Sequence, residues 1–184
     1  MSLRRLAPGG SLSFQVLLVV APERFRDEEL LEPRRALEAR GIRVAVASTR
    51  GGIARGMLGA RVAVDGTVRE ADAGAYRGLL VVGGAGAPAH LWDSEPLRAL
   101  ARVVHDAGHP VGAICLAPPV LARAGLLAGR RATTFPAPRA ILELKRAGAT
   151  YVEEAVVLDG SVVTARGPEA AAAFAQTFAG LLTP

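Results

Sequence analysis

The chain has 184 residues, which suits one domain with a substantial core. Apolar residues make up 51% of it and aromatic residues only 4%, so Ala, Val and Leu must build that core. The net charge of +5 comes almost entirely from scattered arginines, which is not the clustered pattern of a nucleic-acid-binding surface. One cysteine excludes an intrachain disulfide, and the longest apolar run near the start, residues 16–22, is too short to span a membrane. We therefore expect a cytoplasmic protein with neither a nucleic-acid nor a membrane partner.

The first part of the chain predicts a tail followed by alternating strands and helices. Residues 1–13 are rich in Gly, Pro and Ser, and we expect a flexible tail there, followed by one domain over residues 14–184. A continuous apolar run predicts a buried strand, whereas leucines at helical spacing that end at a glycine predict a helix. The resulting elements are a strand at 14–21, a helix at 28–40, a strand at 42–48, and a Gly-rich segment at 51–76 with a short strand at 60–64.

The rest of the chain continues the alternation. The predicted elements are a strand at 79–82, a helix at 95–107, a strand at 110–114, a helix at 118–124, a short strand at 132–135, a helix at 137–147, a strand pair at 151–165 and a closing helix at 168–182. This order predicts an α/β fold, a single-domain doubly wound and mostly parallel sheet with helices on both faces. Ligands of such sheets bind at the carboxyl ends of the strands, so the loops after Val20, Val82 and Ile114 are the candidate site.

The strongest local signal for chemistry surrounds the single cysteine. In the segment VGAICLAP at 111–118, Cys115 stands between a buried strand and a helix, with Ala113 and Ala117 on either side. Small residues at these positions are what a nucleophile elbow needs, because the chain folds back tightly around the nucleophile. The start of the following helix should favour the thiolate, so we expect a thiol pKa below that of a free cysteine. From spacing alone, an inert buried cysteine is an equally good interpretation.

Two further segments lie at the same predicted sheet edge. The acidic run RDEE at 26–29 starts the first helix, where carboxylates are favourable, and one of them can point toward the sulfur. The run GGAGAPA at 83–89 contains a dinucleotide-like G-x-G-x-x-A pattern. No ribose-binding acid follows at the end of the next strand, so we interpret it as a turn whose amides face the thiol rather than as a cofactor site.

Taken together, these segments resemble the ThiJ/PfpI superfamily, whose members resemble class I glutamine amidotransferase domains. The resemblance rests on residues 16–48, the Gly83-Gly84 turn, the AICLA sequence around Cys115 and the TTFP sequence at 133–136, and it covers the chain after the tail. It implies a flavodoxin-like, glutamine amidotransferase-like fold and a homodimer or higher homo-oligomer.

The resemblance also implies roles for particular residues. An acid on the first helix of the family hydrogen-bonds the elbow cysteine, and Glu29 matches it by its spacing to Pro33 and Gly41. The family's oxyanion pocket uses two backbone amides, which correspond here to Gly84 and Leu116. The implied catalytic pair is therefore Cys115 and Glu29.

The sequence departs from the peptidase-like members of the family. These have a histidine directly after the cysteine, where this chain has Leu116, and some members have a histidine at the position of Phe135. They also carry a glutamate, contributed by a neighbouring subunit, where this chain has Ala89. His90 is the one histidine in a loop near the site, and it is a possible accessory residue, although a surface position is the simpler interpretation. One cysteine and scattered histidines indicate no metal site, and we expect no cofactor.

Three functions remain open from the sequence. The first is a cofactor-independent, cysteine-dependent enzyme or stress protein acting on small reactive carbonyls, as in glyoxalases and deglycases. The second is an intracellular peptidase or amidase, which is disfavoured because the imidazole that would protonate a poor leaving group is missing. The third is a non-enzymatic, redox-responsive protein that uses oxidation of Cys115.

Overall fold

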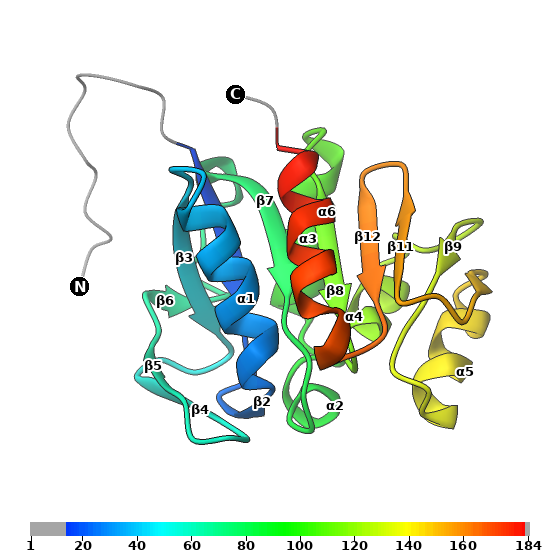
Figure 1. Cartoon of the computed structure of the whole chain (residues 1–184), viewed down its shortest axis with the longest axis horizontal. Helices are drawn as coiled ribbons and strands as arrows, with labels where there is room; N and C mark the ends of the chain where they lie inside the picture. Colours follow the sequence, from blue (N-terminus) through cyan, green and yellow to red (C-terminus); the bar gives the residue numbers. More distant parts are fainter. Residues whose placement is uncertain (1–13, 183–184) are drawn as a thin grey trace.

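The computed structural model describes residues 14–182, so the predicted tail at 1–13 lies outside the described residues. A seven-stranded sheet in the order β11-β12-β8-β7-β1-β3-β6 forms the centre of the fold (Figure 1). Every neighbouring pair in it is parallel except β11 with β12. The strands are β1 (Gln15–Val19), β3 (Arg43–Ser48), β6 (Gly66–Thr67), β7 (Tyr76–Val81), β8 (Val111–Ile114), β11 (Val156–Asp159) and β12 (Val162–Ala165).

Helices cover both faces of this sheet, which confirms the predicted α/β class. α1 (Asp27–Glu38) and α6 (Ala171–Gly180) pack against each other on one face, as Figure 1 shows. α3 (Glu95–Asp106) and α4 (Pro118–Arg123) pack on the other face, and α5 (Pro138–Arg146) lies against α4. Short helical turns complete the helical elements: α2 (Ala87–His90), η1 (Ala73–Ala75) and η2 (Pro168–Ala170). No helix within residues 14–182 is long and apolar enough to cross a membrane.

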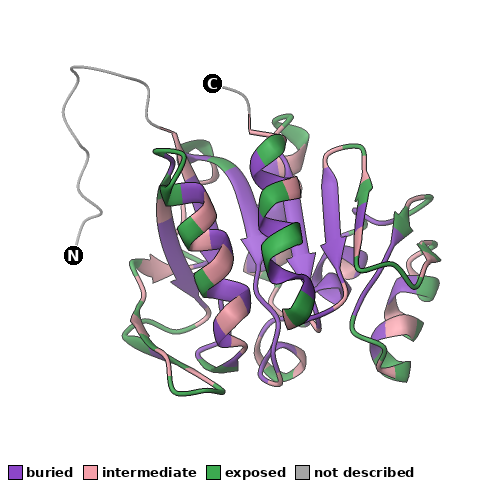
Figure 2. Ribbon diagram, in the orientation of Figure 1, coloured by how far each residue is buried: buried purple, intermediate pink, exposed green. Residues whose placement is uncertain are grey.

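The alternation of side chains along the strands divides the interior into two cores. Leu17 and Val19 of β1 point to the face covered by α3 and α4, whereas Val16 and Leu18 point to the face covered by α1 and α6. Figure 2 shows the buried strands between helices whose outer sides are exposed. Because both faces are covered, the strands have continuous apolar sequences rather than an alternating pattern. Cys115 belongs to the core on the α1 and α6 side.

Two small sheets lie beside the large one and were only partly predicted. β4 (Ile53–Gly56) and β5 (Arg61–Ala63) form an antiparallel hairpin in the Gly-rich segment, and β2 (Glu23–Phe25) pairs with β4. β9 (Arg131–Ala132) pairs with β10 (Thr150–Tyr151). The strand expected at 132–135 therefore ends early, and the strand pair expected from 151 starts at 156. Strands of two or three residues carry too little periodicity to be found from sequence.

The topology determines where a site can form. β1 has β3 on one side and β7 on the other, so the order of strands reverses between β1 and β7. The connections that leave β1 and β7 therefore run to opposite faces of the sheet. This leaves a crevice between them at the carboxyl ends of the two strands. The segments after β1, β7 and β8 meet at this edge, and they are the three segments that contain the candidate site residues.

Candidate active site

Cys115 adopts a backbone conformation that side chains rarely take. Its φ angle is +62°, and its N–H donates to the Ala165 carbonyl at 2.9 Å. The next turn closes at once, because Ala117 N–H donates to the Ile114 carbonyl at 3.0 Å. Such a conformation is strained for a residue with a side chain and persists only when its surroundings fix it. The elbow predicted from the sequence is therefore present as a backbone feature.

Three hydrogen bonds to carbonyl oxygens hold this elbow from outside. The Thr134 hydroxyl donates to the Cys115 carbonyl at 2.7 Å, and the Phe135 N–H donates to the same oxygen at 2.8 Å. The indole N–H of Trp92 donates to the Leu116 carbonyl at 2.6 Å. Sequence reasoning missed Thr134 and Trp92, although TTFP belongs to the resemblance and Trp92 is the single tryptophan of the chain.

The glycine turn after β7 brings a carboxyl group and the thiol together. Gly83 N–H donates to Glu29 Oε2 at 2.9 Å. A Cβ atom on Gly83 would lie 2.6 Å from this oxygen and 2.7 Å from Cys115 Cβ, so only glycine fits between the two side chains. Gly84 has a φ of +106°, and a Cβ there would lie 2.4 Å from Arg26 N. The glycines thus allow a close backbone approach to the β2 segment, which is a structural reason for the pattern that resembled a dinucleotide motif.

The three acids at the start of α1 have three different environments. Asp27 is buried and accepts hydrogen bonds from Leu58 N–H at 3.1 Å and Ala60 N–H at 2.8 Å, which fastens the β4–β5 hairpin. Glu28 is partly exposed and pairs with Arg26, whose Nε lies 2.8 Å from Glu28 Oε2. Glu29 is fully buried and faces the thiol. Of the acidic run, the structure therefore brings Glu29 to Cys115.

Burial dominates the electrostatics of this pair. Removal from water raises the pKa of Glu29 to about 8, against the smaller opposing effects of hydrogen bonds from the Cys115 thiol and the Gly83 amide. Glu29 Oε1 is buried and has no hydrogen-bond partner. Close to neutral pH the carboxyl is mostly protonated, yet a useful fraction is ionised and can accept the thiol proton.

The prediction of a low thiol pKa is wrong for the resting pair. Burial and the Glu29 carboxylate raise the pKa of Cys115 to about 12, although hydrogen bonds from the Gly84 and Leu116 amides oppose this. The expected helix contribution is small for a structural reason. α4 has only six residues and begins with Pro118 and Pro119, which have no N–H groups to direct at the sulfur. The thiol is therefore protonated at rest, and it needs a base.

The remaining predicted residues are placed as follows. The Gly84 and Leu116 amides both act on the Cys115 sulfur and lower the pKa of its thiol. Phe135 lies beside the elbow with 41% of its surface exposed. His90 ends α2 and is partly exposed, and within residues 14–182 no hydrogen bond or ion pair links its imidazole to Cys115 or Glu29.

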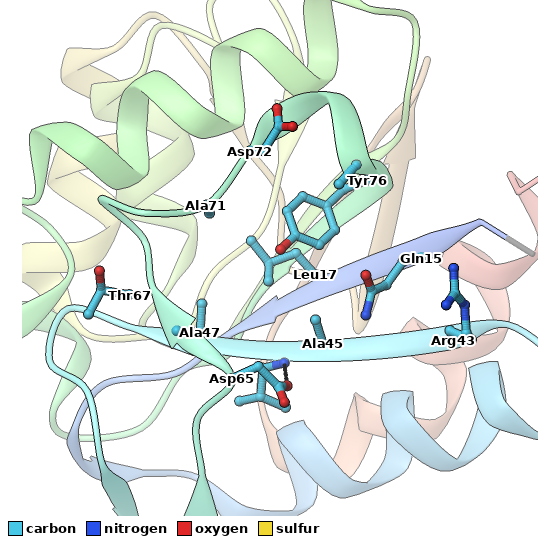
Figure 3. A pocket seen from close by; sticks show the side chains of 13 residues that line it. Gln15, Leu17, Arg43, Ala45, Ala47, Asp65, Thr67, Ala71, Asp72 and Tyr76 are labelled. Atoms are coloured by element: carbon cyan, nitrogen blue, oxygen red, sulfur yellow. Dashed lines mark hydrogen bonds between the residues drawn. The ribbon is translucent and has the colours of Figure 1, made fainter. Parts of the chain in front are cut away.

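Two other kinds of site are relevant in the described part of the chain, residues 14–182: a metal-binding cluster and a cavity away from this pair. Among the described residues, no group of three or more His, Cys, Asp and Glu side chains could hold a metal ion. A cavity of about 450 Å³ lies along β1, β3 and β6, and its lining includes Gln15 and Tyr76 (Figure 3). Its carboxylates already bind backbone amides: Asp65 accepts from Val46 N–H at 2.8 Å, and Asp72 accepts from Gly74 N–H at 3.0 Å. This cavity therefore presents no free carboxylate from Asp65 or Asp72.

A doubly wound sheet with a strained cysteine elbow, a facing buried acid and two amides on the sulfur defines a class of cysteine-centred α/β proteins. Residues 14–180 match the DJ-1/PfpI family, and the chain belongs to this family. The resemblance found in the sequence to the ThiJ/PfpI group is thereby confirmed. The fold agrees: the ThiJ/PfpI domain protein of Brachyspira murdochii superposes with a TM-score of 0.86 at 30% identity, covering 91% of this chain and 95% of that one.

Other relatives extend the comparison. The chain is 46% identical over 160 residues to the protein MJ0967 of Methanocaldococcus jannaschii, which covers 87% of this chain and 78% of that protein. It is 33% identical to the deglycase PYRAB04690 of Pyrococcus abyssi, covering 90% of this chain and 98% of that protein. DJ-1beta of Drosophila melanogaster superposes with a TM-score of 0.82 at 28% identity, covering 92% of this chain and 91% of that one. Proteins named as deglycases are thus among the relatives that match along nearly their whole length.

Proposed function

We propose that this protein is a cofactor-independent enzyme that uses Cys115 to act on small reactive carbonyls, in the manner of a glyoxalase or deglycase. The observation that carries the proposal is the buried Glu29 carboxyl next to the thiol, with a pKa raised to about 8. A base with such a pKa suits proton transfer near neutral pH. The deglycases among the relatives support the same class of substrate.

The proposed reaction begins with proton transfer within the pair. As the Cys115 sulfur adds to the aldehyde carbon, its proton passes to Glu29 Oε1, and the carbonyl π electrons move to the oxygen. The Gly84 and Leu116 amides stabilise this oxyanion. Glu29 then returns the proton to the oxygen and leaves a neutral hemithioacetal. No charge is gained or lost overall, and no cofactor is required.

With methylglyoxal as substrate, the same carboxylate can complete the conversion. Glu29 removes the proton from the carbon bonded to sulfur, which gives an enediolate, and returns this proton to the neighbouring carbon. The hydroxyl proton on the first carbon's oxygen moves to the oxygen of the neighbouring carbon, so that the first carbon becomes a carbonyl. The product is a thioester of lactic acid on Cys115. Water then cleaves the carbon–sulfur bond, releases lactate and restores the thiol.

The low accessibility of the thiol favours a small substrate over a peptide. Cys115 exposes only 6% of its surface, and the neighbouring side chains at Leu116 and Phe135 offer no imidazole to protonate a leaving amine. An aldehyde needs no such proton donor, because no bond to a leaving group breaks in the addition step. We therefore rank carbonyl chemistry above peptide hydrolysis.

The test is turnover of methylglyoxal by purified protein, measured as lactate formation. We expect turnover that is abolished in Cys115→Ala and reduced at least about a hundredfold in Glu29→Gln, the loss expected when a general base is removed. No lactate formation by a folded protein whose thiol still reacts with peroxide would refute the enzyme proposal. It would favour the redox-responsive alternative instead.

A further inference from the structure

The peptide group between Cys115 and Leu116 has partners on both sides. Its N–H belongs to Leu116 and reaches the Cys115 sulfur. Its carbonyl belongs to Cys115 and accepts two hydrogen bonds, from the Thr134 hydroxyl at 2.7 Å and the Phe135 N–H at 2.8 Å. The carbonyl and N–H of one peptide group share its resonance, so whatever holds and polarises the carbonyl also acts on the N–H.

We propose that Thr134 is a positioning residue, whose hydroxyl fixes and polarises the Cys115–Leu116 peptide so that the Leu116 N–H points at the sulfur and at the oxyanion formed from the substrate. Donation to the carbonyl draws electrons from the peptide nitrogen and makes its N–H a stronger donor. The same hydrogen bond also fixes the orientation of this peptide group, which follows the strained Cys115 with its φ of +62°. Thr134 thereby acts on the chemistry through the backbone, without touching the substrate.

The neighbouring threonine shows that burial of a hydroxyl alone does not explain this contact. Thr133 and Thr134 are both fully buried. The Thr133 hydroxyl has no hydrogen-bond partner, and this residue is held instead by its N–H, which donates to Thr164 Oγ1 at 3.0 Å. Two adjacent buried threonines thus differ in what their hydroxyl groups bind: the Thr134 hydroxyl binds the elbow carbonyl, and the Thr133 hydroxyl binds nothing. Thr133→Val is consequently a matched control for Thr134→Val.

The experiment compares Thr134→Val, Thr134→Ser and Thr133→Val with the wild type by two measurements. The first is the pH profile of Cys115 alkylation by iodoacetamide, and the second is kcat and KM for methylglyoxal. For Thr134→Val we expect the thiol pKa to rise by about half a unit. The rate of alkylation at a fixed pH below that pKa should therefore fall about threefold, because the thiolate fraction falls by that factor. We expect kcat to fall about tenfold, less than the loss caused by removing an oxyanion donor outright, with KM nearly unchanged.

Thr134→Ser keeps the hydroxyl and should have the wild-type alkylation profile and the wild-type kcat. Thr133→Val should also resemble the wild type in both measurements. Circular dichroism verifies folding, and Thr134→Ala replaces Thr134→Val if the valine variant does not fold. An unchanged alkylation profile in the folded hydroxyl-free variant, or an equal effect of Thr133→Val, overturns the proposal.

The kinetic half of this test rests on the proposed function, whereas the alkylation half does not. If the wild type forms no lactate while the alkylation profile of Thr134→Val moves to higher pH, the proposed function fails and the role of Thr134 stands. If the wild type turns over methylglyoxal and Thr134→Val changes neither measurement, the role of Thr134 fails and the function stands.

Discussion

Replacing Glu29 by glutamine should stabilise the protein, and by more at higher pH. An acid whose folded-state pKa is raised binds more protons in the folded than in the unfolded state between the two pKa values, so wild-type stability falls as pH rises through that window. For Glu29 the window runs from 4.5 to about 8. At roughly 1.4 kcal/mol per pH unit, the full cost is on the order of 5 kcal/mol above pH 8, and about 3 kcal/mol at pH 7. Glutamine keeps an oxygen for the Gly83 N–H and never ionises.

The measurement is urea unfolding at fixed protein concentration between pH 4.5 and 8.5. Unfolding is monitored by the fluorescence of Trp92, the single tryptophan. The advantage of Glu29→Gln over the wild type should grow with pH across this range and level off above pH 8. Glu32→Gln, in a partly exposed ion pair with Arg35 on the same helix, is the control, and it should change the unfolding free energy by less than about 1 kcal/mol. A difference between Glu29→Gln and wild type that stays constant from pH 5 to 8.5 would refute the assignment of a buried, proton-binding carboxyl.

Four other outcomes are expected. Methylglyoxal turnover should rise with pH and level off near an apparent pKa of about 8, because the ionised form of Glu29 is the base; a flat profile in steady-state assays would exclude this. Gly83→Ala should abolish thiol alkylation and turnover in a folded protein, because the added methyl would lie within 2.6 Å of the Glu29 carboxyl, whereas Gly180→Ala, with open space around it, should keep both. Casein cleavage should be undetectable, since Leu116 and Phe135 provide no imidazole; cleavage that depends on the thiol would contradict this. We propose a homodimer, for which light scattering at micromolar concentration should give twice the 19.0 kDa chain mass, and a monomer mass would disprove it.

The sequence predicted the central sheet well because its signals are local and strong. The apolar runs at 16–19 in β1 and 79–81 in β7 mark their strands. α3 is bounded by a serine that caps its start and by Gly108 after its end. The small β2-β4-β5 sheet was not predicted as a unit. Its strands depend on a long-range tether, the Asp27 carboxylate binding two amides of the hairpin, and no pattern within the hairpin reveals that.

The sequence predicted those parts of the site that depend on residue type and on position along the chain. The cysteine, the glycine turn and the acid are all visible as residue types at particular positions. The contacts of Thr134 and Trp92 are not visible, because both act on backbone carbonyls from segments far from Cys115 in sequence. β9 also ends at Ala132, two residues before the threonine, where the sequence predicted a strand.

The ionisation of the Cys115 thiol is the feature that the sequence predicted in the wrong direction, and the reason bears on mechanism. A helix start was expected to favour the thiolate, but two prolines remove the amides that would do so, and burial favours the neutral forms of both groups. A permanently ionised thiolate would be open to oxidation and to any electrophile that reaches it. A neutral thiol that reacts only as Glu29 takes its proton is instead activated together with bond formation to a carbonyl. The environment that makes the resting thiol weakly acidic is therefore the same environment that keeps Glu29 a base of suitable strength.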